Sequence, residues 1–340
     1  MIIDVHNHFI GEAAKRFILK EGKARGIDAS EDAAGNLAID FGFRTLSVGP
    51  EMFEPELRLE AMKQRGIDAQ LLTISATHAF YGQDAGFVAE HLTAVNEDGA
   101  RMAAAHPGKF YPTAAVPLLD VSAGVKEARR AVRDLNARAI FMNSNLDGVH
   151  LDDRRFDPLY ETVQDLGVPI IVHPITPASR QGMEGYHLFN LCGFQFDHAL
   201  NLARMVLSGV FERFPRLRAF FTHGGGPTLF LRGRWDHAYG IREDTRADIP
   251  KPPSAYFDRI WFGTVVFSPT TLEFVIRSVG ADHVCLGSDY PYDMEDPDPV
   301  GLVRKVGVLS ASESEAVLSG NAKDLFDLRD IDAPAAQEPG

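Results

Sequence analysis

Short apolar runs recur along the chain, and helical patterns separate them. The apolar runs lie near residues 2–8, 69–75, 111–116, 138–143, 168–173, 218–223, 259–265 and 283–288. Most are continuously apolar, which is typical of parallel strands covered on both faces. Helical patterns lie at 56–65, 87–106, 122–136, 158–166, 198–214, 227–241 and 269–279.

Strand and helix alternate about eight times, which predicts an α/β chain folded as a distorted (β/α)₈ barrel of the TIM type. A doubly wound open sheet is less favoured, because no Gly-x-Gly-x-x-Gly follows the first strand. We expect one barrel domain over 1–328 and a loose tail over 329–340. The stretch 10–55 is too long for a simple loop, so we expect an insertion after the first strand that caps the barrel mouth.

Composition and charge narrow the class of protein. The 340 residues are 45% hydrophobic and 24% charged, and the net charge is −13. These values predict a soluble globular protein and argue against nucleic acid or an anionic membrane as a partner. We expect no membrane span and no signal peptide. Cys192 and Cys285 lack a Cys-x-x-Cys spacing, so we expect reduced thiols and a cytoplasmic protein.

Four polar side chains at the ends of three apolar runs predict a metal site. His6 and His8 lie in the first run, His173 ends the fifth, and Asp289 follows the eighth. Strands of a barrel point their carboxyl ends at one face, so we expect these residues to converge. His6 and His8 are two residues apart and would point the same way. Imidazole and carboxylate ligands suit a zinc-type cation. Singly, each motif could also be a polar strand end or a turn.

His223 ends the sixth run and precedes three glycines. We interpret it as a general acid/base beside the metal, because imidazole exchanges protons near neutral pH. A role as a further ligand remains the alternative. The fourth run ends in Asn-Ser-Asn at 143–145, without the lysine or glutamate that would bridge a second metal. This pattern favours one metal ion.

These residues resemble the amidohydrolase superfamily, and within it the aminocarboxymuconate-semialdehyde decarboxylase-like group. The resemblance covers nearly the whole chain. Besides the ligands it rests on segments 54–62, 207–217, 223–226, 231–234, 252–256, 286–291 and 319–322. Two features depart from patterns in that group. Ile175 and Thr176 stand where the aminocarboxymuconate enzymes have Trp-Asp, and His8 stands where some benzoate decarboxylases have glutamate.

The resemblance implies non-oxidative decarboxylation of an unsaturated or aromatic carboxylic acid. It implies one divalent metal ion, zinc first and manganese second, held by His6, His8, His173 and Asp289. His223 would handle the proton, and Asp289 is a candidate for a second, catalytic role as proton acceptor.

The resemblance also implies two arginines that bind the carboxylate of a small-molecule substrate. Arg44 would do so from the insertion, and Arg234 from the neighbouring subunit of a homodimer. Arg234 lies 11 residues after His223, which is roughly 16 Å along a helix, too far to serve its own site. Each arginine could instead be a solvated charge. A hydrolase or hydratase on the same scaffold, or a barrel that only binds a metal, are the competing interpretations.

Overall fold

The computed structural model describes residues 1–41, 45–175 and 181–328. All eight predicted strand regions form strands. They are β1 (Ile3–Asp4) with β2 (His8–Phe9), β6 (Ala69–Ile74), β7 (Phe110–Pro112) with β8 (Ala114–Ala115), β9 (Ile140–Asn143), β12 (Ile170–His173), β13 (Ala219–Phe221), β14 (Ile260–Gly263) and β15 (Val284–Cys285).

The strands pair in parallel and close into a distorted barrel. β1 and β2 both pair with β6, and β6 also pairs with β7. The remaining strands follow in the order β8, β9, β12, β13, β14, β15. The closure is made by backbone bonds, since Val5 N donates to Leu286 O at 2.9 Å and His8 N donates to Tyr290 O at 2.7 Å. The predicted (β/α)₈ class is confirmed.

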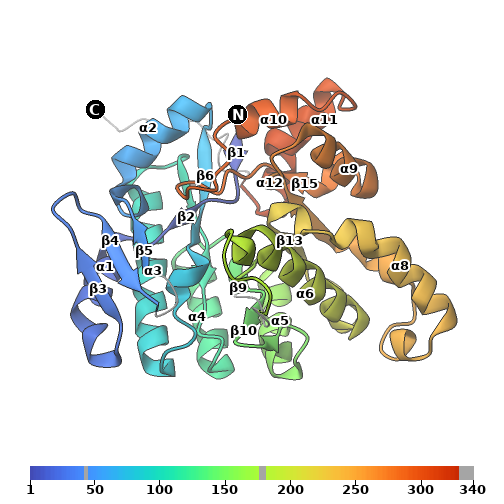
Figure 1. Cartoon of the computed structure of the whole chain (residues 1–340), viewed down its shortest axis with the longest axis horizontal. Coiled ribbons are helices and arrows are strands. Elements are labelled where there is room, and N and C mark those ends of the chain that lie inside the picture. Colours follow the sequence, from blue (N-terminus) through green and yellow to red (C-terminus); the bar gives the residue numbers. More distant parts are fainter. Residues whose placement is uncertain (42–44, 176–180, 329–340) are drawn as a thin grey trace.

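Helices on the outside cover the strands (Figure 1). They are α2 (Pro55–Arg65), α3 (Ala85–Ala105), α4 (Val121–Asp134), α5 (Asp157–Leu166), α6 (Gln195–Leu207), α7 (Val210–Arg213), α8 (Thr228–Ile241), α9 (Pro269–Val279), α10 (Pro299–Arg304), α11 (Ala311–Glu315) and α12 (Asn321–Leu325). The helix predicted at 198–214 is in fact two helices, because Gly209 adopts φ 74° between them. A Cβ there would lie 2.6 Å from Asp248 O, so only glycine fits.

The insertion after the first strand contains α1 (Glu12–Glu21) and a three-stranded antiparallel sheet of β3 (Asp28–Glu31), β4 (Leu37–Asp40) and β5 (Thr45–Val48). The first turn of α1 is fixed to α3, since the backbone amides of Ala13 and Ala14 donate to Asp98 Oδ2 at 2.8 and 3.0 Å. At the other end, Thr45 and Leu46 line a cavity beside the metal-site residues. The cap over the mouth stays a prediction, and the tail at 329–340 lies outside the described residues.

Aromatic packing between α1 and α3 buries a histidine. The His91 ring lies against Phe17, Phe80 and Phe87, and its Nε2 donates to His78 O at 2.7 Å. Burial lowers the pKa of His91 to about 4. In the part of the chain that the structure describes, no helix is both long enough and apolar enough to cross a bilayer.

We expect acid to destabilise the protein between about pH 6.5 and pH 4. Above this range His91 is neutral in both the folded and the unfolded protein. Within the range the unfolded chain binds a proton on His91, whereas the buried ring of the folded protein stays neutral. Each pH unit then costs about 1.4 kcal/mol for such a group. Urea unfolding at about pH 7 and pH 5 would measure the loss, and His91→Leu should show a fall smaller by about 2 kcal/mol. An unchanged pH dependence in that variant would contradict the assignment.

Candidate metal centre

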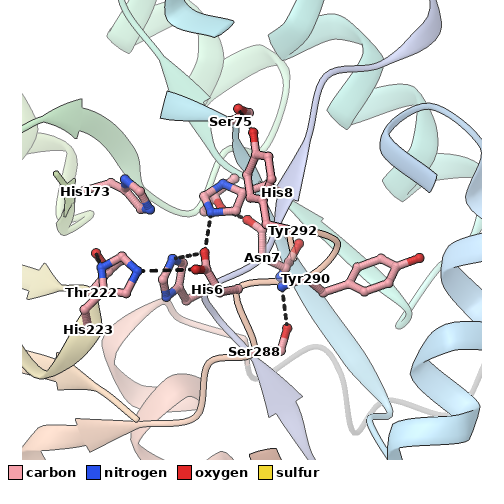
Figure 2. Close-up of polar contacts among 12 residues, drawn as sticks. His6, Asn7, His8, Ser75, His173, Thr222, His223, Ser288, Tyr290 and Tyr292 are labelled. Atoms are coloured by element: carbon pink, nitrogen blue, oxygen red, sulfur yellow. Dashed lines mark hydrogen bonds and ion pairs between the residues drawn. The ribbon is translucent and has the colours of Figure 1, made fainter. Parts of the chain in front are cut away.

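The carboxyl ends of the first, fifth, sixth and eighth strand regions bring four histidines and one aspartate together. Figure 2 shows the four histidine side chains gathered in one place. His6, His8, His173 and Asp289 each offer one ligand atom, and these atoms lie within 4.8 Å of one another. All four residues are buried. The strand alternation acts as expected: the rings of His6 and His8 both reach the cluster, with centroids 5.3 Å apart.

Hydrogen bonds assign the tautomers of two of these rings. His173 Nδ1 lies 2.6 Å from Pro174 O, and His8 Nδ1 lies 3.3 Å from Ile74 O. A carbonyl only accepts, so both Nδ1 atoms carry the proton and both Nε2 atoms present a lone pair. His8 Nε2 nevertheless faces Asp289 Oδ1 at 2.8 Å. Two acceptors so close repel each other unless a cation lies between them.

The ionisation states fit a cation as well. Burial lowers the pKa of His6 to about 4, with Asp289 opposing and the neighbouring His223 and His8 adding to the effect. Burial likewise holds the pKa of His173 well below its usual value. Burial raises the pKa of Asp289, but the electrostatic interaction with the adjacent His6 and the close approach of His223 and His8 outweigh it and hold that pKa well below its usual range. Neutral imidazoles with an ionised carboxylate form the ligand set that zinc-type ions prefer.

Three ring nitrogens of the ligand residues, both of His6 and Nε2 of His173, have no hydrogen-bond partner among the described residues. Within the described ranges, neither His6 Nε2 nor His173 Nε2 has a hydrogen-bond partner, although His6 Nε2 lies 3.1 Å from Asp289 Oδ1. Buried polar atoms are rarely left so, and each one costs about 1–3 kcal/mol. The residues present therefore fit a bound divalent ion.

His223 lies on the other side of the same carboxylate. Its Nε2 is 3.4 Å from Asp289 Oδ2, whereas the oxygen facing His6 and His8 is Oδ1. Its Nδ1 lies 3.0 Å from Thr222 Oγ1 and 3.3 Å from Nε2 of the buried His198. His223 thus has one nitrogen toward the site and the other held from behind, which is how a proton-transferring imidazole is oriented.

The turn after β13 makes this placement feasible. His223 has φ 50°, and Gly224, Gly225 and Gly226 follow at 62°, 68° and 58°. A Cβ on Gly226 would lie 2.2 Å from Gln195 O. The three glycines therefore let the chain leave the strand in a left-handed path against α6.

A fully buried arginine on α2 holds the backbone segment that carries His6 and His8. Arg58 of α2 donates to His8 O and Asn7 Oδ1, both at 2.6 Å, and to Gln70 Oε1 at 2.9 Å. Burial lowers the pKa of Arg58 to about 10, so it remains charged at neutral pH. Asp4 beside it accepts from Ser288 Oγ at 2.7 Å, which links the first strand region to the eighth.

We expect Arg58→Met to lower the free energy of unfolding by about 3 kcal/mol, because it leaves several buried acceptors without a donor. Urea denaturation of the metal-free protein would measure this. Arg16→Met is the matched control, since the Arg16 side chain is 65% exposed and should change stability by less than about 0.5 kcal/mol. Equal effects of the two substitutions would contradict the role of Arg58.

The structure places one of the two arginines predicted to bind substrate, Arg234, and it does not lie at the cluster. Arg44 lies outside the described residues, although its neighbours Thr45 and Leu46 line the adjoining cavity. Arg234 is exposed on α8 and forms neither a hydrogen bond nor an ion pair with any described residue. Only Thr228 and Leu229 of that helix are buried, and Figure 1 shows α8 extending away from the barrel.

The cluster opens into two adjoining cavities. A polar one of about 280 Å³ is lined by His8, His173, Ser75 and Tyr292 among others. Tyr292 hydrogen-bonds Ser75 through its hydroxyl, and its ring lies 5.1 Å from the His8 ring. An apolar cavity of about 490 Å³ lies beside it.

Sequence reasoning missed Arg58, His198 and Tyr292 as site residues. Arg58 and His198 lie within helical patterns, where a charged or polar residue usually faces solvent. Tyr292 follows Asp289 by three residues, and that proximity was the only signal that could have suggested it.

A parallel barrel that gathers histidines and an aspartate at the carboxyl ends of its strands is typical of metal-dependent enzymes. The family model described as Amidohydrolase matches residues 3–328. The chain therefore belongs to the amidohydrolase family.

Three known proteins that are similar to this chain cover almost its full length. The 2-amino-3-carboxymuconate-6-semialdehyde decarboxylase of Dictyostelium discoideum is 27% identical over 332 residues, covering 96% of this chain and 91% of the relative. The crystal structure of 5-carboxyvanillate decarboxylase from Sphingomonas paucimobilis superposes with a TM-score of 0.81 at 23% identity. The match covers 96% of this chain and 98% of that chain. The structure of dihydroxybenzoic acid decarboxylase from Polaromonas sp. JS666, solved with bound manganese and 2-nitroresorcinol, has a TM-score of 0.79 at 22% identity. The match covers 96% of this chain and 97% of that chain.

Proposed function

We propose that this protein is a metal-dependent decarboxylase that removes CO₂ from an unsaturated or aromatic carboxylic acid. The observation that carries the proposal is the convergence of His6, His8, His173 and Asp289 on one point, with His223 beside them. The similar proteins described above are decarboxylases of acids of this kind, which supports decarboxylation over the other reactions of such a site.

The four ligand residues would hold one divalent ion, zinc or manganese. When bound there, such an ion supplies a Lewis acid that stabilises negative charge on oxygen. Donor set alone does not separate the two metals, since geometry and availability decide the occupant. Metal analysis of protein purified without added metal, followed by reconstitution with each ion, identifies the active form.

The protein's own groups account for the proton and the substrate's position. His223 moves a proton at Nε2 and places it on the ring or chain carbon that loses CO₂, while Thr222 and His198 hold its Nδ1. The new carbon–hydrogen bond uses a π electron pair of the substrate, and the electron pair of the carbon–carbon bond restores the conjugated system when that bond breaks and CO₂ leaves. Phe194 lines both cavities and offers a flat apolar face to that system. Arg44 would bind a carboxylate from the side of the insertion.

Product analysis tests the reaction class. Candidate carboxylated aromatics and muconate semialdehydes are incubated with the metal-loaded protein in ¹⁸O-labelled water. Release of CO₂ with a product one carboxyl group smaller, and no label in that product, is expected. Labelled oxygen retained in the product would instead indicate a hydrolase or hydratase, which is the second candidate on this scaffold.

We further propose that the protein is a homodimer in which Arg234 enters the partner's site. Support comes from α8, where Phe230 and Ile241 are 78% and 67% exposed on the same helix as Arg234, which has no hydrogen bond or ion pair with a described residue. Exposed apolar groups on a projecting helix are typical of an interface. A cytoplasmic location is proposed as well, and the free thiols of Cys192 and Cys285 support it.

Mixed dimers test the crossing arginine. His223→Ala and Arg234→Ala proteins should each be nearly inactive, and refolding or co-expressing them together should restore about a quarter of wild-type activity, because half the dimers then contain one complete site. If Arg234 served its own subunit, no mixed dimer would have a complete site and activity would not return. The Arg234→Ala homodimer and the Arg234→Lys homodimer serve as controls.

A further inference from the structure

The apolar cavity of about 490 Å³ is continuous with the proposed reaction centre. It shares with the polar cavity the lining residues Asn190, Phe194, His223, Asp289 and Met294. One end of the cavity therefore lies at the carboxylate of the metal cluster. A molecule whose reacting carbon lies beside His223 could extend into it without a break.

Polar and apolar groups are separated along this cavity. Among the described residues that line it, the ionisable side chains are His223 and Asp289, both at the end next to the metal cluster. The remaining wall is mainly aliphatic and aromatic, and includes Val265, Val266, Phe267 and Phe274. Such a wall has no described charge to match a second carboxylate. It complements a ligand that is charged at one end and apolar at the other.

The shape of the apolar wall is set by the backbone. At the turn after β13, a Cβ on Gly224 would lie 2.8 Å from Val266 Cγ1, so a larger residue there would displace Val266 of the wall. On the facing loop, Phe267 adopts φ 58°, a left-handed conformation that bulky residues rarely take. Such strain is kept where surrounding structure and use require it. Phe267 and Phe274 are 52% and 44% exposed, so they form the outer rim.

We propose that this cavity binds a non-polar substituent of the substrate, so that the preferred acid carries an alkyl or aryl group remote from the carboxyl group that is lost. The inference rests on the proposed decarboxylase function and specifies its substrate class. A small acid without such a group would leave the apolar wall in contact with water. Each methylene buried there should contribute about 0.8 kcal/mol.

A homologous series tests the inference. Metal-loaded protein is assayed with 2,6-dihydroxybenzoic acids that carry hydrogen, methyl, ethyl or propyl at position 4, opposite the carboxyl group. The expected result is a rise in kcat/KM of about fourfold per added carbon. The binding constants of the corresponding products, resorcinol and its 5-alkyl derivatives, are measured by calorimetry and should follow the same slope.

Two variants locate the effect. Phe274→Asp places a carboxylate on the partly exposed rim, where folding should tolerate it, and is expected to abolish the slope. Val308→Asp is the matched control, because Val308 is 37% exposed and does not line either cavity; it should keep the slope.

The outcomes separate this inference from the function on which it rests. Turnover of the parent acid with no dependence on chain length would overturn the inference and leave the decarboxylase function standing. Failure to decarboxylate any acid would reject the function, and the calorimetric slope would still decide the cavity's ligand class. A flat series together with loss of the dimer in Phe274→Asp would show that a second copy of the chain covers this wall, which also overturns the inference.

Discussion

Removal of divalent metal ions by a chelator is expected to lower the rate of decarboxylation by at least about 10³-fold, since a Lewis acid contributes several kcal/mol to such a transition state. The described residues that line the two cavities include no lysine or arginine whose charge could replace that of the ion. Activity should return when zinc or manganese is added back. Rates of CO₂ release, with metal content measured in parallel, provide the test.

The same treatment should change stability. An ion that binds only the folded chain stabilises it by about 2.7 kcal/mol at a concentration one hundred times its Kd. Chelation should therefore lower the thermal midpoint, and His8→Gln should lower both the metal content and this difference. His106→Gln, outside the cluster, is the control. Full activity in protein shown to be free of metal would contradict the assignment of this cluster as a catalytic metal centre.

The second large effect is expected from His223→Ala. Loss of the proton-transferring imidazole should lower kcat by about 10²–10⁴-fold with little change in KM. Metal content should stay at the wild-type level, because Asp289 turns a different oxygen toward His6 and His8 than toward His223. A matching loss of metal would show that His223 is a ligand, the alternative left open by the sequence.

His198 provides a graded control for the same step. His198→Met removes the partner of His223 Nδ1 and should cost about 10–100-fold in kcat. His198→Gln keeps a donor and an acceptor at similar reach, so it should lose less. Equal losses in the two variants would mean that His198 acts only through packing.

The metal ligands could be predicted from sequence because the barrel topology fixes where the residues at the strand ends lie. Parallel strands end on one face, so a residue at a strand end has a known place before any contact is known. The alternation of His6 and His8 by two adds the direction of both rings. His223 could be predicted for the same reason, although its contact with Asp289 Oδ2 could not.

The residues behind the cluster could not be predicted. Arg58 contacts His8 and Gln70 from a neighbouring helix, and His198 reaches His223 from α6. Each lies in a helical pattern whose polar positions usually face water, and only the packing of that helix against the barrel turns them inward. The break at Gly209 was missed because it depends on a close approach of Asp248, far along the chain.

By itself, the sequence determined the strand and helix order, the barrel class, and which side chains meet at its carboxyl end, because these follow from local periodicity and from the common direction of parallel strands. The tertiary structure decided what surrounds that cluster. Hydrogen-bond partners, pKa shifts, the buried Arg58 and the apolar cavity between α9 and the turn after β13 arise from contacts between distant segments. Such contacts depend on how whole elements pack, which no local pattern specifies.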